Sequence, residues 1–261
     1  MNNKTVVVTG GVQGLGREIA LCFARQGWNI ALADVLDETG AVTLNEIKKL
    51  GVDGLYCHCD VRKEADHQAL LQASIERFGR VDLLINNAGV ASHGAIDKES
   101  VESWQRVLDI NSLGPVLGCK TFVPHFKVQR AGHIVNVASI AGITCTPYMA
   151  SYNVSKAAVI ALSETLRWEL KPKNIGVTVV CPALFKTNLT SSMAGVNENV
   201  KSAIDKGMGA SSIGAADIAE QIFKAVQNNQ FMLLPHLHTR WQWRLKRLSF
   251  SGYQWLMARL A

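Results

Sequence analysis

Short runs of apolar and β-branched residues alternate with longer amphipathic segments along most of the chain. The short runs are typical of strands buried on both faces, and the longer segments have helical spacing. Strands are predicted at 5–9, 29–33, 54–59, 82–85, 133–138, 176–181 and 231–234. Helices are predicted up to about 26, at about 38–50, at 64–78, between about 100 and 129, and around Tyr152 as far as about 170. This alternation predicts an α/β fold, a doubly wound parallel sheet in a single domain.

A glycine-rich turn lies between the first predicted strand and the helix that follows it. Its sequence is Thr9-Gly10-Gly11-Val12-Gln13-Gly14-Leu15-Gly16. Glycines at such a turn let the chain reverse tightly, and they let a pyrophosphate approach the backbone at the helix N-terminus. The turn therefore predicts dinucleotide binding by a Rossmann-like sheet, through Gly10, Gly14 and Gly16.

Asp34 ends the second predicted strand. A carboxylate at this position can accept hydrogen bonds from the ribose hydroxyls of adenosine, and it repels a 2′-phosphate. The nearby positions 13 and 35 hold Gln and Val, while Arg17 is a possible phosphate ligand inside the helix. We therefore expect NAD in preference to NADP; a solvated strand-end carboxylate is the alternative for Asp34.

Tyr152 and Lys156 are four residues apart, so they share one face of a helix. A lysine ammonium beside a phenol favours the phenolate and lowers a pKa that is normally about 10. Such a pair can act as a general acid and base. Ser139 precedes the pair, and taken alone it is typical of a strand-end serine that caps a turn. An exposed helical pair without function is the alternative, but the glycine turn in the same chain argues against it.

These motifs, in this order, resemble those of the short-chain dehydrogenases/reductases of the compact single-domain type, and the likeness covers about 4–234. Gly10, Gly14 and Gly16 match the TGxxxGxG turn of the family. Asp60-Val61 resembles its adenine-contacting pair, and Asn86-Asn87-Ala88-Gly89 matches its NNAG segment. The residues that match its catalytic tetrad are Asn111, Ser139, Tyr152 and Lys156.

The resemblance implies a role for each matching residue. Tyr152 takes the proton of a substrate hydroxyl as hydride passes to the nicotinamide, and Lys156 lowers the pKa of Tyr152 and holds the ribose. Ser139 binds the substrate oxygen, and Asn111 holds a water that connects Lys156 to solvent. Pro182 lies beside the cofactor and Thr187 bonds the nicotinamide carboxamide. One departure is Pro182-Ala183, where the family has Pro-Gly; we expect a local backbone adjustment there.

The net charge of +6 is concentrated at the C-terminus, because the five basic residues after position 230 have no acidic counterpart and the rest of the chain carries only +1. Arg240, Arg244 and Arg247 have helical spacing, with Trp241, Leu245 and Leu248 on an adjoining face. Such a segment can lie on an anionic membrane, or it can pack on a neighbouring subunit or over the substrate cleft. A basic face that would bind nucleic acid is not evident in the rest of the chain.

We therefore expect a dinucleotide-binding and catalytic domain at 1–235 and a basic aromatic tail at 236–261. The predicted function is hydride transfer between NAD and a lipophilic secondary alcohol or ketone, in a homodimer or homotetramer built partly from the helices between 100 and 129. Alternatives are an NADPH-dependent reductase of 3-oxoacyl groups, and a non-catalytic NAD-sensing or membrane-docking protein. We expect no metal site and six buried thiols, including Cys145. The N-terminus has no signal-peptide pattern and no run of about 18 apolar residues occurs, so a cytoplasmic location is expected, possibly peripheral to a membrane.

Overall fold

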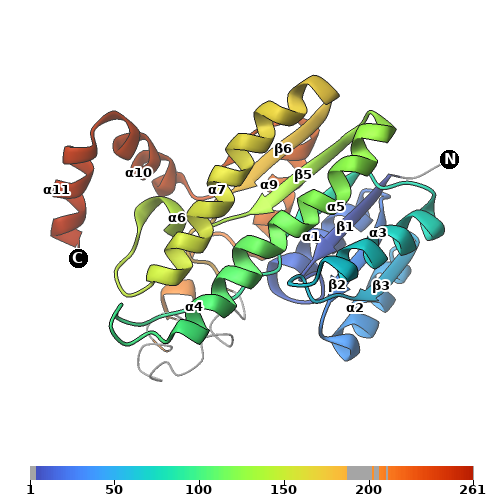
Figure 1. Cartoon of the computed structure of the whole chain (residues 1–261), viewed down its shortest axis with the longest axis horizontal. Helices are drawn as coiled ribbons and strands as arrows, with labels where there is room; N and C mark the ends of the chain where they lie inside the picture. Colours follow the sequence, from blue (N-terminus) through green and yellow to red (C-terminus); the bar gives the residue numbers. More distant parts are fainter. Residues whose placement is uncertain (1–3, 187–201, 203–205, 210, 261) are drawn as a thin grey trace.

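A seven-stranded parallel sheet forms the centre of the structure, a computed structural model that describes residues 4–186, 202, 206–209 and 211–260 (Figure 1). Its strand order is β3-β2-β1-β4-β5-β6-β7. The chain therefore turns back between β1 and β4, which confirms the doubly wound α/β prediction. The strands are β1 Thr5–Thr9, β2 Asn29–Asp34, β3 Gly54–His58, β4 Leu83–Asn86, β5 Gly132–Val137, β6 Ile175–Val180 and β7 Met232–Leu233.

Helices cover both faces of the sheet (Figure 1). One layer contains α1 Gly14–Arg25, α2 Asp37–Lys49 and α9 Ala215–Gln227, and the other contains α3 Glu64–Phe78, α5 Gly114–Gln129 and α7 Ala150–Leu170. The alternation of side chains along β1 explains the two cores, because Val6 and Val8 pack against the first layer and Val7 packs against the second. An apolar strand sequence is thus required on both faces.

The predicted helical stretch between 100 and 129 is divided into three parts. α4 Val101–Leu108 begins at Ser100, whose Oγ accepts a hydrogen bond from the N–H of Ser103. A π-helical segment, Asp109–Leu113, follows and leads directly into α5. π-Helical turns are rare and occur mostly at functional sites. Here the segment carries the fully buried Asn111 toward the carboxyl end of β4.

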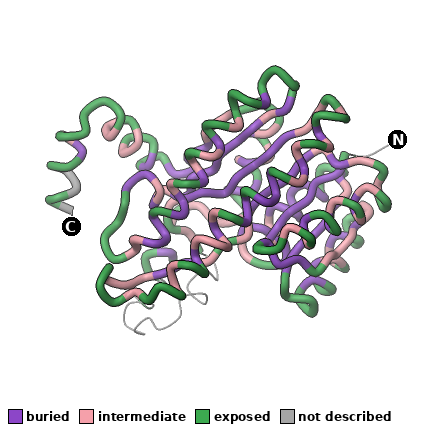
Figure 2. Tube along the Cα trace, in the orientation of Figure 1, coloured by how far each residue is buried: buried purple, intermediate pink, exposed green. Residues whose placement is uncertain are grey.

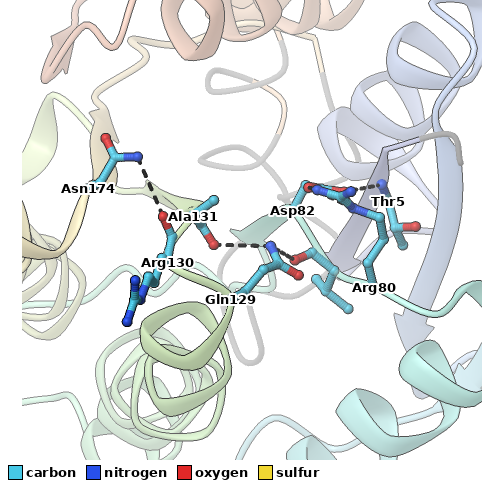
Figure 3. A network of polar contacts seen from close by, with 8 residues as sticks. Thr5, Arg80, Asp82, Gln129, Arg130, Ala131 and Asn174 are labelled. Atoms are coloured by element: carbon cyan, nitrogen blue, oxygen red, sulfur yellow. Dashed lines mark hydrogen bonds and ion pairs between the residues drawn. The ribbon is translucent and has the colours of Figure 1, made fainter.

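Polar contacts join the segments that precede the central strands, at the amino-terminal edge of the sheet (Figure 3). The Asp82 carboxylate accepts hydrogen bonds from the Thr5 N–H at 2.9 Å and from the Arg80 guanidinium. The Gln129 amide donates to the carbonyls of Val81 and Ala131, each at 3.0 Å. These contacts satisfy backbone groups at the edge opposite to the predicted site, so that edge has a structural role.

After β7 the chain forms two helices, α10 Leu237–Leu248 and α11 Phe250–Leu260, which project at one end of the molecule (Figure 1). They contact a short helix that the sequence did not predict, α6 Ala141–Thr144. Most of their residues are exposed (Figure 2). The described part of the chain contains no helix that is both long and apolar enough to cross a bilayer. The boundary between a domain at 1–235 and a tail at 236–261 stays a prediction.

Cys145 is exposed, so the prediction that all six thiols are buried is wrong. The reason is local: Cys145 ends α6 in a left-handed conformation and its side chain lies outside the core. Thr187 lies outside the described residues, as do most of the residues between 183 and 213.

Candidate active site

The carboxyl ends of the strands open into one cleft of about 750 Å³. Ligands of open α/β sheets bind at this edge, where the strand order reverses. The structure brings most of the predicted site residues to the wall of this cleft, although they come from loops far apart in the sequence. The predicted residues that line it are Gly10, Gly14, Asp34, Asp60, Val61, Asn87, Ala88, Gly89, Ser139, Tyr152, Lys156 and Pro182.

The glycine turn is shaped by two left-handed residues and one close contact. Gly10 and Gly14 have φ angles of +61° and +52°, which side chains rarely adopt. Gly16 does not line the cleft; a Cβ there would collide with the carbonyl oxygen of Gly10. Gly16 therefore lets the first turn of α1 close onto the turn itself. The Asn87 amide completes the turn by donating to the carbonyl of Gly10 at 3.0 Å.

Asp34 is a buried carboxylate held by the backbone. It accepts hydrogen bonds from the N–H groups of Val12 at 3.4 Å, Val35 at 2.8 Å and Leu36 at 3.3 Å. Burial raises the pKa of Asp34 from its ordinary value, and the three hydrogen bonds oppose that rise. The carboxylate is therefore fixed in direction at the end of β2, on the wall of the cleft.

Arg17, the possible phosphate ligand, is engaged elsewhere. Its guanidinium forms ion pairs of 2.6 Å with Glu18 and with Glu46. Two carboxylates compete with any phosphate for this side chain. Arg17 therefore has a structural role beside the turn, as the ion-pair partner of these two carboxylates.

Asp60 lies at the third strand's carboxyl end with a partner that sequence reasoning missed. The Arg62 guanidinium contacts both of its carboxylate oxygens, with the shortest distance at 2.7 Å. This ion pair holds the pKa of Asp60 below its ordinary value. Arg62 also lines the cleft. Its position two residues after Asp60 was the available signal, since a basic residue there can reach back over the turn.

Asn111 is packed behind Gly89 and Val90 and does not line the cleft. Its side chain accepts a hydrogen bond from the Val90 N–H and donates to the Val90 carbonyl, both at 2.8 Å. It also donates to the Ser155 hydroxyl at 3.1 Å. A Cβ on Gly89 would lie 3.3 Å from both Asn111 Oδ1 and Lys156 Nζ. Asn111 thus fixes the backbone after β4 against α7; its predicted role in holding a water stays a prediction.

Tyr152 and Lys156 face the cleft from one side of α7, as their spacing predicts. The Lys156 ammonium donates to the Val137 carbonyl at 3.0 Å and lies 5.8 Å from the centre of the Tyr152 ring. Ser139 follows β5, and its hydroxyl accepts a hydrogen bond from the Ala141 N–H at 3.1 Å. Ser139 and Tyr152 line the same cleft, and the Ser139 hydroxyl acts to lower the pKa of Tyr152. The three groups thus meet where β5 ends.

The predicted lowering of the Tyr152 pKa by Lys156 stays a prediction, because burial has the larger effect on both groups. Burial raises the pKa of Tyr152, and the Ser139 hydroxyl opposes the rise only in part. Burial also lowers the pKa of Lys156 to about 8. The physical reason is that both side chains are buried, and the Lys156 ammonium donates to the Val137 carbonyl. Sequence spacing gives the shared face but not the degree of burial.

The remainder of the cleft wall is largely apolar, and its residues belong to none of the sequence motifs. It includes Val90, Ile140, Met149, Leu184, Phe185 and Met208. His93 also lines the cleft and stacks on Tyr148 with ring centres 6.0 Å apart. These residues come from loops without a motif, so only their position in the fold could reveal them.

The departure at Pro182-Ala183 has its own partner. The Ala183 N–H donates to Nδ1 of the buried His236 at 3.2 Å, and the Pro182 carbonyl accepts from the Ile140 N–H at 2.9 Å. His236 immediately precedes α10. A residue at the start of the tail therefore holds the loop in which the sequence departs from the family pattern.

Comparison with known proteins gives the family. The model of the short chain dehydrogenase family matches residues 4–197, so the chain belongs to that family of oxidoreductases. It is 36% identical over 193 residues to a 3beta-hydroxysteroid dehydrogenase from Eggerthella lenta, covering 73% of this chain and 74% of the relative. It is 34% identical over 194 residues to a 3-oxoacyl-(acyl-carrier-protein) reductase from Staphylococcus epidermidis, covering 74% and 79%.

A solved structure shares almost the whole fold. It is a short chain dehydrogenase/reductase from Burkholderia phymatum in complex with NAD, with a TM-score of 0.89 and 32% identity. The likeness covers 95% of this chain and 94% of that chain. The relation therefore extends beyond the family-model match into the C-terminal part of the chain.

Proposed function

We propose that the protein is an NAD-dependent dehydrogenase or reductase that interconverts a lipophilic secondary alcohol and its ketone. The observation that carries this proposal is the meeting of Ser139, Tyr152 and Lys156 in the same cleft as the glycine turn and Asp34. A dinucleotide fits this cleft, because backbone without a Cβ lines it at Gly10, Gly14 and Gly89.

The preference for NAD rests on Asp34. Its carboxylate is fixed by three backbone N–H groups, and the following residues, Val35 and Leu36, are apolar. A 2′-phosphate next to this carboxylate would meet a like charge. The Burkholderia phymatum structure, which contains NAD, supports the same preference.

The chemistry assigned to the chain is proton transfer and orientation. The bound nicotinamide supplies the hydride acceptor or donor. The Tyr152 hydroxyl exchanges a proton with the substrate oxygen, and the Ser139 hydroxyl binds that oxygen and stabilises its developing charge. Lys156 carries the nearby positive charge that favours the phenolate once the cleft is filled. Asn111 holds the backbone beside Lys156 in place.

The lipophilic substrate is supported by the cleft wall. Side chains such as Ile140, Met149 and Phe185 offer apolar surface next to Tyr152. Burial of apolar substrate surface contributes about 25 cal/mol per Å². The relative from Eggerthella lenta, whose name gives it a hydroxysteroid as substrate, points in the same direction.

The proposal includes a cytoplasmic homo-oligomer that touches a membrane through its tail. Apolar side chains on the surface of the helices between 100 and 129 support self-association, among them Val101, Leu113 and Val116. The exposed basic and aromatic side chains after β7 support the membrane contact.

Replacement of Tyr152 by Phe tests the proposal, because it removes only the hydroxyl. We expect this variant to fold and bind NADH, and to lose at least about 100-fold in kcat on secondary alcohols. Tyr148→Phe is the matched control: Tyr148 is an exposed tyrosine close to the cleft, and its loss of a hydroxyl should change kcat little. Equal turnover by wild type and Tyr152→Phe would contradict the proposal.

A second candidate is an NADPH-dependent reductase of 3-oxoacyl groups. The Staphylococcus epidermidis relative favours it, since that protein is named as such a reductase. The two candidates differ in cofactor. Initial rates with NADH and NADPH on an apolar ketone and on a 3-oxoacyl thioester therefore distinguish them, and a preference for NADPH would overturn the argument from Asp34.

A further inference from the structure

α10 has two different faces. Thr239, Trp243 and Lys246 lie on the side toward the body, where Thr239 is buried and Trp243 packs on the core beside β7. The Lys246 ammonium donates to the carbonyl of Ile143 in α6. This face therefore anchors α10 to the domain, and it accounts for one of the tail tryptophans.

The opposite side of α10 is apolar and exposed. Leu237, Trp241 and Leu248 are 73%, 71% and 86% exposed, and together with Arg244 they fall within about 60° on a helix of 3.6 residues per turn. The sequence predicted Leu245 on this side, but Leu245 is half-buried. Large apolar side chains are thus aligned along an exposed side of the helix.

α11 adds a second exposed aromatic group beside a basic one. Its Tyr253 is buried and donates to the Thr144 carbonyl at 3.0 Å, which attaches α11 to α6. Trp255 is exposed, and the Arg259 guanidinium lies 3.7 Å from its ring centre. In α10 the Arg244 guanidinium lies 5.6 Å from the Trp241 ring. Both exposed tryptophans are thus paired with an arginine.

We propose that this surface docks on a bilayer that contains anionic lipid. The tail face is defined as Leu237, Trp241, Arg244, Leu248, Trp255 and Arg259. Tryptophan and arginine suit the interface of a bilayer, because their apolar parts reach the acyl boundary and their polar groups stay among the headgroups. The inference deepens the membrane contact of the proposed function by naming the residues and the lipid charge.

Charge complementarity favours lipid over a second copy of the chain. Residues after position 230 include five basic side chains and no acidic one. In a two-fold contact between copies, each tail face would meet the same cationic face. Anionic headgroups instead offset this charge, with each arginine near the surface strengthening binding about fivefold.

The docked helices also border the substrate region. A cavity of about 740 Å³ lies between them and the cleft, lined by Leu237, His238 and Gln242 from the tail and by Ile140, Ala183 and Leu184 from the cleft wall. The last three residues line the main cleft as well. Docking by the tail face thus places a bilayer against α10, the helix that borders this cavity.

Sedimentation with vesicles tests the proposal on the full chain. We expect wild type to bind vesicles of phosphatidylcholine and phosphatidylglycerol in about equal parts, and to bind at least about 10-fold more weakly to phosphatidylcholine alone or at high salt. Trp241→Ala should weaken binding about 10-fold and Arg244→Gln about fivefold. The matched control is Trp168→Ala. Trp168 is also exposed (63%) and has an arginine, Arg167, over its ring, but it lies on α7, outside the tail face, so its replacement should leave binding unchanged.

The outcomes separate the candidates. Equal binding to both vesicle types, or equal loss with Trp241→Ala and Trp168→Ala, would overturn the proposal. So would a fall in oligomer size by light scattering with Trp241→Ala, because it would assign the tail face to a second copy. Tyr152→Phe should bind vesicles as wild type does, so failure of the catalytic proposal leaves this test intact.

Discussion

Lys156 is expected to reduce the stability of the free protein, and its replacement by Met should show this. Its ammonium is buried, and burial lowers its pKa from 10.5 to about 8. A difference of this size disfavours the charged folded form by roughly 3 kcal/mol. Met has similar length and removes that cost, but it leaves the Val137 carbonyl without its 3.0 Å hydrogen bond, which offsets about 1–2 kcal/mol. Lys156→Met should therefore be more stable by roughly 1–2 kcal/mol near pH 7.

The sign of this effect determines how the stability of the protein changes with pH. The pKa of Lys156 is lower in the folded than in the unfolded protein, so the unfolded protein binds the proton more tightly. The stability of wild type is therefore reduced in full below about pH 8, recovers as pH rises from about 8 to 10.5, and is not reduced by this group above that range. The advantage of Lys156→Met should shrink across the same interval and reverse when only the lost hydrogen bond remains.

Urea unfolding followed by circular dichroism measures this difference, near pH 7 and near pH 10. Protein without cofactor is used at one concentration, since ligands and oligomers shift apparent stability. The control is Lys49→Met at the exposed end of α2, which should change stability by only a few tenths of a kcal/mol at either pH. A Lys156→Met protein that is less stable by the same amount at both pH values would refute the reasoning, since the burial of a charge would then contribute nothing.

Three further predictions concern Asp34, the glycine turn and His236 at the start of the tail. Asp34→Ser should shift the ratio of kcat/KM for NAD over NADP by about 10- to 100-fold toward NADP, because it removes the like charge; an unchanged ratio would contradict the role of Asp34. Gly14→Ala should lower the free energy of unfolding by about 1 kcal/mol through left-handed strain. Gly16→Ala should lower it further in thermal unfolding, because only its Cβ collides with backbone. His236→Leu leaves the Ala183 N–H without its acceptor and should raise the KM for NAD about 5- to 30-fold, while His236→Asn, which keeps an acceptor, should restore most of it.

The cofactor half of the site could be predicted from sequence because its residues stand at fixed places in a strand–turn–helix unit. Gly10 and Asp60 follow a strand by one or two residues and Asp34 ends one, and the carboxyl ends of parallel strands meet at one edge. Their convergence therefore follows from topology alone. The same reasoning placed Tyr152 and Lys156 on one face of a helix, where the structure has them.

The substrate half could not be predicted in this way. Ile140, Phe185 and Met208 come from connections whose course is set by tertiary packing. The spacing of Tyr152 and Lys156 also could not predict the direction of the Tyr152 pKa shift, because that direction depends on burial and on where the lysine points. The five basic residues of the tail were visible in the sequence, but which tryptophan of α10 faces the body depends on the contacts of Trp243 and Lys246.

The tail is attached to the loops that surround the cleft. Three side chains after position 235 form hydrogen bonds with the body near the site: His236 with Ala183, and Lys246 and Tyr253 with Ile143 and Thr144 of α6. These partners lie just beyond Ser139 and Pro182, the two points where β5 and β6 open into the cleft. Because the backbone on both sides of the substrate region is tied to the tail, a force that repositions α10 acts on that region directly. The two proposals, lipid binding by the tail face and an apolar substrate at Tyr152, are thus linked through these contacts.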